Sequence, residues 1–359
     1  MFNLDESQHY AAFDPGDMLK TIRELPVQVE RAWQIAMEAP LPDDVAAVER
    51  IVVVGMGGSA IGADLLAGLM ARKGTIPFEV VRGYALPAHI RGPKTLVIAS
   101  SYSGNTEETL TAFAEAARRS TRLMAVTTGG KLAAQAREAG FPLWTFDYRS
   151  TPRAALGYSF TLLVGLAKRL GVLPIREGSV EEAVGHLRTM QAHLLPEVPA
   201  ASNDAKAWAL WLQDTLPAVF GSGFLGAAAR RWKGQFNENA KQWAMWDELP
   251  ELNHNLVVGL GLPQTVVPDH LRVIFLRSNI DHPRVQLRWQ ITAELLQQNG
   301  IEVREAYGLG ESAFAQLLTV IHFGDFVSYY LAALNGADPS PVENITYLKR
   351  RLAEFPAGG

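Results

Sequence analysis

Short apolar segments in the first 150 residues alternate with stretches that have the periodicity of amphipathic helices. Such short apolar runs are typical of strands that are buried on both faces of a parallel sheet. The runs cover 51–54, 78–81, 96–100, 123–127 and 143–146. The intervening helices are predicted to end near residue 74 and to cover 106–120 and 133–139. This alternation predicts a doubly wound, parallel α/β domain.

The rest of the chain predicts an N-terminal helix, a helical connection and a second α/β domain. Asp14 and Pro15 suit the cap and the first position of a helix, which the apolar spacing extends to Trp33. Further helices are predicted at 227–243, 284–298 and 312–334, and further strands at 219–220, 272–276 and 301–304. We therefore predict a first domain at 1–153, a helical connection at 154–215 and a second domain at 216–359 with a C-terminal helix.

The composition excludes several classes of site. The net charge is −4, so no broad basic surface for nucleic acid or an anionic membrane is indicated. Cysteine is absent, which excludes disulfides, thiolate catalysis and Cys-ligated metals. The first residues lack a secretory signal pattern, and no apolar run approaches the roughly 20 residues of a membrane span. We expect a soluble, cytoplasmic protein that binds neither nucleic acid nor membrane.

A turn rich in hydroxyl groups lies between the third predicted strand and the helix after it. Ser101, Ser103 and Thr106 supply hydroxyls there, and Gly104 lets the backbone approach a ligand. The first amides of a helix are unpaired and lie at the positive end of its dipole, so they favour a phosphate. For any one of these hydroxyls taken alone, simple capping of the helix is the better explanation. The density of the whole cluster favours a phosphate site.

Two glycine-rich turns have the position of a dinucleotide-binding turn, between a strand and a helix. The first, GMGGSAIG, contains Gly57, Gly58 and Ser59, and the second, GSGFLG, begins at Gly221. A dinucleotide site also needs an acidic residue at the end of the second strand. Arg82 stands there in the first half, and in the second half this position falls within a predicted helix. We therefore favour contact of the first turn with a small ligand, and we expect no cofactor.

Three side chains outside these turns are candidates for catalysis. Arg153 follows the last strand of the first domain, at the edge of the sheet where open α/β proteins bind ligands. Glu238 lies between two asparagines on a predicted helix and is a candidate general base. His254 lies between two asparagines on a loop. The histidines lack metal-ligand spacing, so we expect no metal.

Several motifs, in order along essentially the whole chain, identify a family that this sequence resembles. They are GMGGSAIG, SYSGNTEETL, TPRAAL, FNENAK, the His-Asn pair after ELN, and the terminal ITYLKRRL. Together they resemble the bifunctional phosphoglucose/phosphomannose isomerases of the sugar isomerase (SIS) domain superfamily. SYSGNT marks only an SIS domain, which also occurs in glucosamine synthases and sugar-phosphate sensors. FNENAK with the downstream histidine and LKRRL is far more specific.

The resemblance implies two SIS domains, which are flavodoxin-like, three-layer αβα sandwiches, and a metal-independent isomerisation of 6-phosphosugars. Glucose 6-phosphate and mannose 6-phosphate would both yield fructose 6-phosphate through a cis-enediol. Glu238 is implied as the base and Arg153 as the cation that stabilises the enediolate oxygen, while His254 and Lys349 open the sugar ring. The implied assembly is a homodimer in which His254 comes from the neighbouring subunit. The implied phosphate contacts are Ser59, Ser101, Ser103, Thr106 and the amides of Gly57 and Gly58.

Two positions depart from the family pattern. Ser340 stands where the family has a threonine before proline that leaves room for the C2–C3 bond to rotate, so the mannose activity is less secure than the glucose activity. Thr346 stands where an aspartate is common. The alternatives are a non-catalytic SIS protein that binds sugar phosphates and an amino-sugar isomerase or deaminase. A base and two proton carriers, Glu238, His254 and Lys349, argue against a sensor.

Overall fold

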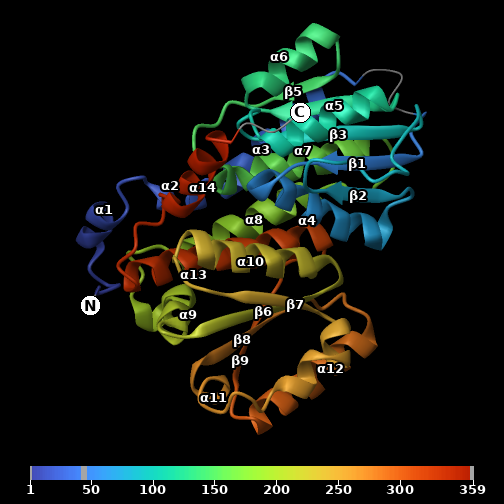
Figure 1. Ribbon diagram of the computed structural model, residues 1–359. Coiled ribbons are helices and arrows are strands. Elements are labelled where there is room, and N and C mark those ends of the chain that lie inside the picture. The colour runs from blue at the N-terminus through green and yellow to red at the C-terminus, as the bar shows by residue number, and fades with distance from the viewer. Residues whose placement is uncertain (1, 42–46, 356–359) are drawn as a thin grey trace.

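The protein contains two parallel sheets, each packed against helices and joined through a central group of helices (Figure 1). The computed structural model describes residues 2–41 and 47–355. The prediction of two doubly wound α/β domains is confirmed. Helices lie at both ends of the chain, also as predicted.

The first sheet has the strand order β2-β1-β3-β4-β5, and all of its strands are parallel. This is the flavodoxin-like order, in which the chain reverses direction across the sheet between β1 and β3. All seven residues of β3 are buried, as its continuous apolar run predicts. The strands are β1 (Arg50–Val54), β2 (Phe78–Val81), β3 (Thr95–Ser101), β4 (Arg122–Thr127) and β5 (Leu143–Thr145).

Three helices follow strands of the first sheet and cover its faces. They are α4 (Gly57–Lys73), α5 (Glu107–Arg118) and α6 (Gly130–Ala139). The loops before α4 and α5 leave the sheet at the carboxyl ends of β1 and β3, which are neighbouring strands. The fold therefore places the two turns that the sequence singled out beside each other.

The second sheet has the order β7-β6-β8-β9 and is also entirely parallel. Its helices are α10 (Gly226–Glu238), α11 (Val267–His270) and α12 (Pro283–Gln298). Its strands are β6 (Leu216–Ser222), β7 (Met245–Leu249), β8 (Leu271–Arg277) and β9 (Glu302–Tyr307).

Strand β7 corrects the prediction that helix fills this part of the second half. Helix α10 ends at Glu238, five residues before the predicted end, and Lys241 then turns the chain with a positive φ of 54°. The strand escaped detection because only Leu249 among its five residues is buried. Such an edge strand lacks the apolar run by which the other strands were predicted.

The N-terminal helix is interrupted, in contrast to the single helix predicted from Asp14 and Pro15. After α1 (Tyr10–Phe13), helix α2 (Met18–Arg23) is followed at Glu24 by α3 (Leu25–Glu38). Pro15 lies before α2 and not at its first position. The carboxylate of Asp14 still accepts hydrogen bonds from the amides of Met18 and Leu19, so it serves the beginning of α2 as a cap does.

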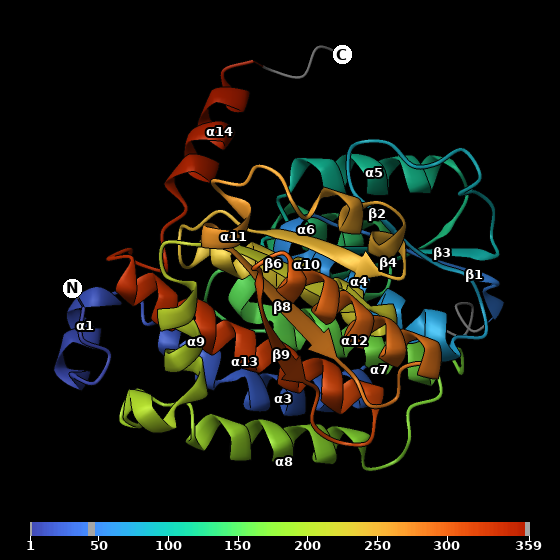
Figure 2. The same ribbon diagram turned by 90° about the horizontal axis from the view of Figure 1, so that it is seen from below.

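Central helices connect the two sheets (Figures 1 and 2). α7 (Leu156–Arg169) packs against α3 and α4, and α8 (Ser179–Ala192) packs against α3 and α13 (Ala313–Leu334). Helix α13 also contacts α9 (Asp204–Leu212) and α10. Among the described residues α13 is the one helix long and apolar enough to cross a membrane, but 94% of its most apolar window is buried in the protein. Helix α13 is therefore a buried core helix of the fold.

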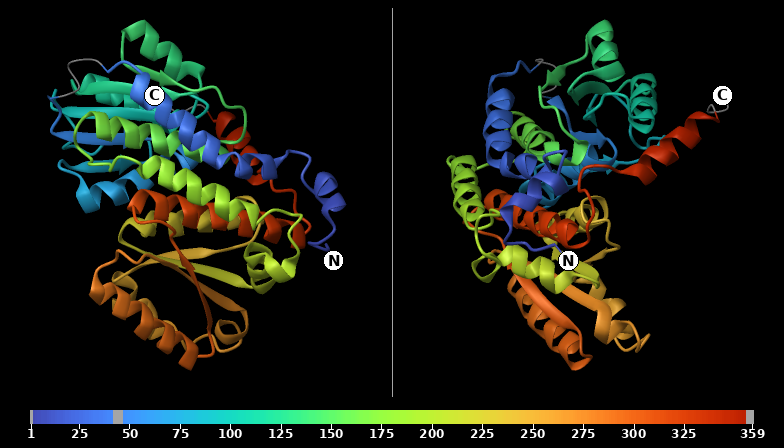
Figure 3. Two further views of the ribbon diagram at one scale, coloured as in Figure 1. Left: turned by 180° about the vertical axis from the view of Figure 1, so that it is seen from behind. Right: turned by 90° about the vertical axis from the view of Figure 1, so that its left-hand side faces the viewer.

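Helix α14 (Glu343–Ala353) projects from the body of the protein (Figures 2 and 3). None of its residues is buried. The chain reaches it from the end of α13 through Pro339 and Ser340, which lie beside Arg153.

Candidate active site

The hydroxyl-rich turn between β3 and α5 gathers side-chain oxygens beside the first amides of α5. The hydroxyl of Ser101 accepts a hydrogen bond from the amide of Gly104 (3.1 Å) and shares one with the hydroxyl of Thr106 (3.1 Å). The exposed Ser103 accepts from the amide of Asn105 (3.2 Å). Thr106 stands at the N-cap of α5, yet its side chain accepts no hydrogen bond from the helix amides. Those amides therefore remain available to an anion.

Gly104 fixes the shape of this turn. Its φ is +65°, and a Cβ atom there would lie 1.9 Å from the carbonyl oxygen of Gly129. Only glycine combines this left-handed backbone with so close an approach. The loop is consequently tied to the beginning of α6, and the amide of Leu132 donates a hydrogen bond to the carbonyl of Gly104 (2.9 Å).

The first glycine-rich turn packs directly against the segment that carries Arg153. Gly57 has a φ of +49°, and a Cβ atom on Gly58 would lie within 2.8 Å of the carbonyl of Pro152 and the amide of Arg153. The buried hydroxyl of Ser59 accepts a hydrogen bond from the amide of Tyr102 (2.9 Å). Ser59 thus joins the two turns, and glycine at 58 allows them to approach Arg153.

Arg153 and Glu238 face each other across the two halves of the chain. Nη1 of Arg153 lies 3.5 Å from Oε2 of Glu238, with the arginine side chain 5% exposed and the glutamate side chain 35% exposed. Burial lowers the pKa of the Arg153 guanidinium below its ordinary value, and the nearby Glu238 opposes that shift. An arginine still keeps its charge under such conditions. A carboxylate and a buried cation therefore meet at a partly open position.

The other nitrogens of Arg153 are occupied by the protein. Nε donates to Oδ1 of Asn239 (2.9 Å), and Nη2 donates to the carbonyls of Pro339 (2.5 Å) and Ser340 (3.1 Å). Nη1 makes no hydrogen bond with the described part of the chain, so its N–H groups face Glu238 and remain available to a ligand oxygen. The hydrogen bonds of Nε and Nη2 therefore fix the orientation of the guanidinium group.

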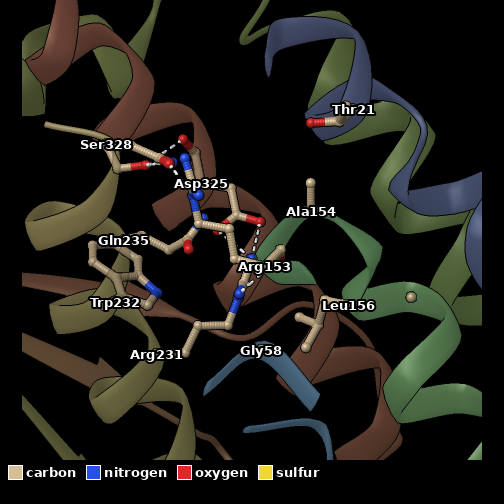
Figure 4. A network of polar contacts seen from close by, with 12 residues as sticks. Thr21, Gly58, Arg153, Ala154, Leu156, Arg231, Trp232, Gln235, Asp325 and Ser328 are labelled. Atoms are coloured by element: carbon tan, nitrogen blue, oxygen red, sulfur yellow. Dashed lines mark hydrogen bonds and ion pairs between the residues drawn. The ribbon is translucent and has the colours of Figure 1, made fainter. Parts of the chain in front are cut away.

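A closed ring of polar contacts runs through Arg153, and Figure 4 shows its members Arg231, Asp325 and Ser328. Asn239 donates to the hydroxyl of Ser328 (3.0 Å), which donates in turn to the carbonyl of Asp325 (2.8 Å). The carboxylate of Asp325 accepts two hydrogen bonds from Arg231 (2.9 and 2.7 Å), and Arg231 also donates to the carbonyl of Arg153 (3.3 Å). These residues come from α10, α13 and the turn before α7, so the ring fixes Arg153 relative to both halves.

Sequence reasoning missed three members of this ring, namely Arg231, Asp325 and Ser328. A signal was present, because Asp325 and Ser328 lie three residues apart on a mostly apolar helix and continue a row of polar residues at the same spacing, Gln316, Thr319 and His322. Arg231 and Gln235 have a matching spacing of four residues on α10, and Gln235 also donates to Asp325 (3.0 Å). Polar residues at helical spacing on two buried helices indicate a shared polar network.

Lys241 is a second cation near Glu238 that the sequence analysis did not single out. Its Nζ donates to the carbonyl of Glu238 (2.5 Å). Partial desolvation, followed by the charge of Arg153, lowers the pKa of this lysine below its ordinary value.

His254 and Lys349 lie apart from this centre. His254 is exposed at the end of a short 3-10 helix (Glu251–His254), and Lys349 is exposed on α14. Neither makes a hydrogen bond or ion pair with Glu238 or Arg153 in the part of the chain that the structure describes. One chain thus brings together the turns, Arg153 and Glu238, but not the two implied ring-opening groups.

Ser340 contributes its backbone to the centre. Its carbonyl accepts from Arg153, whereas its hydroxyl is buried without a hydrogen-bond partner. The hydroxyl packs against Gly16, where a Cβ atom would lie 2.2 Å from Oγ.

The second glycine-rich turn is filled by the protein's own carboxylate. A Cβ atom on Gly226, the first residue of α10, would lie 2.4 Å from the carboxyl carbon of Glu248 on β7. Burial raises the pKa of Glu248 above its ordinary value. Because Glu248 occupies the beginning of α10, this turn offers no space for a pyrophosphate. Across residues 2–41 and 47–355, no group of three or more histidine or acidic side chains is placed to hold a metal ion.

Comparison with known proteins decides the family. A model of the SIS domain matches residues 45–141, and a model of the bacterial phospho-glucose isomerase C-terminal SIS domain matches residues 201–352. A bifunctional phosphoglucose/phosphomannose isomerase of Caldicellulosiruptor bescii is 40% identical over 94% of this chain and 99% of its own length. The chain belongs to the bifunctional phosphoglucose/phosphomannose isomerase family. The family resemblance inferred from the motifs is confirmed.

Other relatives agree with this membership. The isomerase of the same description from Aquifex aeolicus is 34% identical over 86% of this chain and 92% of its own length. A crystal structure of a hypothetical protein from Thermus thermophilus matches with a TM-score of 0.74 at 18% identity, covering 99% of this chain and 94% of that one. That structural likeness supports the fold alone. Membership of the family makes this protein an isomerase of sugar phosphates and not a non-catalytic sensor.

Proposed function

We propose that this isomerase interconverts glucose 6-phosphate and mannose 6-phosphate with fructose 6-phosphate through a cis-enediol. The observation that carries the proposal is the 3.5 Å approach of Arg153 Nη1 to the carboxylate of Glu238. Moving a proton between C1 and C2 of a sugar requires a base at carbon and a donor at the neighbouring oxygen. Glu238 and Arg153 supply these two roles side by side.

Glu238 takes the proton from the carbon next to the carbonyl group and returns it to the adjacent carbon. Negative charge then develops on the carbonyl oxygen, and the free N–H groups of Nη1 stabilise it. Three hydrogen bonds from the other nitrogens of Arg153 hold the guanidinium in place before the reaction begins. Little reorganisation is needed when the charge appears, which is the usual source of electrostatic catalysis.

The phosphate group binds at the carboxyl ends of β1 and β3 in this proposal. Ser101, Ser103 and Thr106 supply hydroxyls, and the amides that begin α5 supply further donors. Ser59 and the amides of Gly57 and Gly58 line the same side. Two observations support the arrangement: the unused amides of α5 and the hydrogen bond that joins Ser59 to the other turn.

The remaining parts of the mechanism need a second subunit. We infer that the protein is a homodimer. Its sugar ring-opening groups would be Lys349 and the copy of His254 that the partner supplies. The exposure of both side chains in one chain agrees with this placement.

We also propose that the protein acts in the cytoplasm and that its domains span 1–153 and 216–359, with 154–215 as the connection. Ser340 is proposed to tune acceptance of mannose 6-phosphate.

The decisive experiment is a coupled assay of fructose 6-phosphate formation from each hexose 6-phosphate. We expect the Glu238→Gln variant to lose turnover by about 10²- to 10⁴-fold while it keeps its affinity for a phosphate ligand. The exposed Glu294→Gln on α12 is the matched control and should retain activity. Activity of Glu238→Gln within tenfold of the unchanged protein would refute the role of the base.

Full activity after exhaustive treatment with EDTA is expected, and rescue of a dead enzyme by zinc would contradict the metal-independent mechanism.

A further inference from the structure

A cavity of about 320 Å³ lies between the two halves of the chain, at the carboxyl ends of β8 and β9. Ile280 follows β8 and lines the cavity, and so does the segment 312–314, which follows β9 and begins α13. The opposite walls are the end of α4 and the segment 173–176, which connects α7 to α8. Open parallel sheets bind ligands at this edge, and a cavity of this volume holds a small molecule.

Three cationic side chains line the cavity, namely Arg72, Lys73 and Arg176, and Glu311 is the one carboxylate among the described lining residues. Nη2 of Arg176 lies 2.8 Å from Glu182 and 3.9 Å from Glu311, so its charge is partly neutralised. Lys73 is exposed and makes no hydrogen bond or ion pair within the described part of the chain. The walls therefore carry an excess of positive charge, which favours an anionic ligand.

Arg72 is held over the edge of the second sheet. Its Nη1 donates to the carbonyl of Ile280 (3.2 Å), and its guanidinium carbon lies 6.0 Å from the centre of the Phe224 ring. These two contacts are to the segments that follow β8 and β6, the neighbouring strands between which the chain reverses across the sheet. The nearby Asp281 accepts a hydrogen bond from Ser222 (2.6 Å) and forms no ion pair with Arg72. Arg72 thus brings an uncompensated guanidinium to the cavity.

The remaining lining is mostly apolar. Leu69, Leu173 and Phe314 are buried beside the cavity, and Ile280 is partly buried. A ligand that fills this space needs an apolar body to cover these side chains and a charged group to reach the cations. Inorganic phosphate alone would leave the apolar part of the lining uncovered.

We propose that this cavity binds a small organic phosphate with a compact apolar body, at a site separate from that of the substrate. A phosphate monoester carries about two negative charges near neutral pH, and a guanidinium group binds its oxygens through paired N–H groups. Arg72 and Lys73 supply the cations for it. The cavity lies at the opposite end of α4 from Gly58, about 20 Å away along the helix axis. This site does not rest on the proposed function.

Protection of Lys73 from chemical acetylation tests the site in the unchanged protein. The protein is treated with N-hydroxysuccinimidyl acetate in increasing phenyl phosphate, and mass spectrometry of peptides gives the rate at each lysine. At about ten times the Kd of phenyl phosphate, acetylation of Lys73 should slow about tenfold. Lys94, whose side chain is 70% exposed just before β3, is the control and should keep its rate. Benzyl alcohol has a similar ring without the charge and should not protect Lys73.

Two variants test whether the cations hold the phosphate group. Arg72→Gln should raise the Kd of phenyl phosphate about 10- to 100-fold, because it removes hydrogen bonds between charged groups. Arg176→Gln should raise this Kd by a smaller factor, since Arg176 is already paired with Glu182. The exposed Arg137→Gln near the end of α6 is the matched control and should leave the Kd unchanged. Circular dichroism verifies that each variant is folded.

Three results would refute the proposed site. They are the absence of protection at Lys73, equal protection by benzyl alcohol, and a Kd that neither Arg72→Gln nor Arg176→Gln changes. Acetylation does not depend on turnover. A protein that protects Lys73 but lacks isomerase activity would therefore count against the proposed function alone.

Discussion

Oδ1 of Asn239 accepts a hydrogen bond of 2.9 Å from Nε of Arg153 and so joins the residue after α10 to the turn before α7. Glu238 immediately precedes Asn239. The proposed base and the residue that orients Arg153 are therefore neighbours in sequence, and any movement of the end of α10 shifts both. This link gives Asn239 a role beyond its middling helix propensity, whereas Asn237 donates to the carbonyl of Gln242 (2.8 Å).

Replacing Asn239 with leucine should slow the chemical step without weakening substrate binding. A hydrogen bond to a charged group contributes about 1.5–3 kcal/mol, which corresponds to a fall in kcat of about 10- to 100-fold if Arg153 is released. KM should change less than threefold because the phosphate turns are untouched. Ser328→Ala is the control, since it removes the next bond of the ring and leaves the acceptor of Arg153 in place. A raised KM with an unchanged kcat would exclude a positioning role.

The strands of both sheets show what the sequence could predict. β3 is buried along its whole length, so its apolar run was sufficient. β7 was missed because Met245 and Trp246 are exposed at the sheet edge and acidic residues follow them. Strand β7 pairs with β6, and α10 separates the two strands along the chain. The local pattern of apolar residues therefore cannot reveal that they pair.

The site shows the same division between local and long-range information. Glu238, Arg153 and the two turns could be named because each lies within a recognisable local motif. The contact of Arg231 with Asp325 joins residues 94 positions apart on two helices, so no local pattern specifies it. The positions of His254 and Lys349 relative to the base were out of reach for another reason. Both side chains are exposed, and within the described residues neither makes a hydrogen bond or ion pair with Glu238 or Arg153.

The ion pair between Arg231 and Asp325 should be essential to stability. Both side chains are buried, at 4% and 9% exposed, and Nη2 of Arg231 donates to both carboxylate oxygens of Asp325. Asp325→Asn leaves a buried arginine charge without its counterion, and we expect a loss of about 3–5 kcal/mol in the free energy of unfolding. Urea denaturation measures this loss. The double change Arg231→Met/Asp325→Leu should recover at least half of it, whereas a single variant within about 1 kcal/mol of the unchanged protein would contradict the prediction.

Gly104→Ala should disrupt the turn that we propose for the phosphate group. Alanine costs about 1–2 kcal/mol in a left-handed conformation, and its Cβ atom would also meet the carbonyl of Gly129. The turn must therefore move, and we expect KM for fructose 6-phosphate to rise at least tenfold. Gly92→Ala is the matched control, because its φ is +81° but nothing lies within 4 Å of the added atom. Equal effects of the two variants on KM would show that the close approach at Gly104 has no role.

His322 should make the stability of the fold sensitive to acid. Complete burial on α13 lowers the pKa of His322 to about 3, from an ordinary value of 6.5. Between these values the unfolded chain binds a proton that the folded protein excludes, so stability falls as the pH decreases through this window. The slope is about 1.4 kcal/mol per pH unit, which amounts to about 2 kcal/mol between pH 6.5 and 5. Above pH 6.5 this contribution is constant.

Urea denaturation of the unchanged protein and of His322→Phe at pH 7.5 and 5.0 isolates that contribution. The ring of phenylalanine fills similar space beside Phe326 but does not titrate. We expect the variant to lose about 2 kcal/mol less than the unchanged protein between the two pH values. The exposed His270→Gln should lose as much as the unchanged protein, because its ring meets water in both states. If His322→Phe also matches the unchanged protein, then His322 takes up a proton within the folded core and the buried neutral imidazole is refuted.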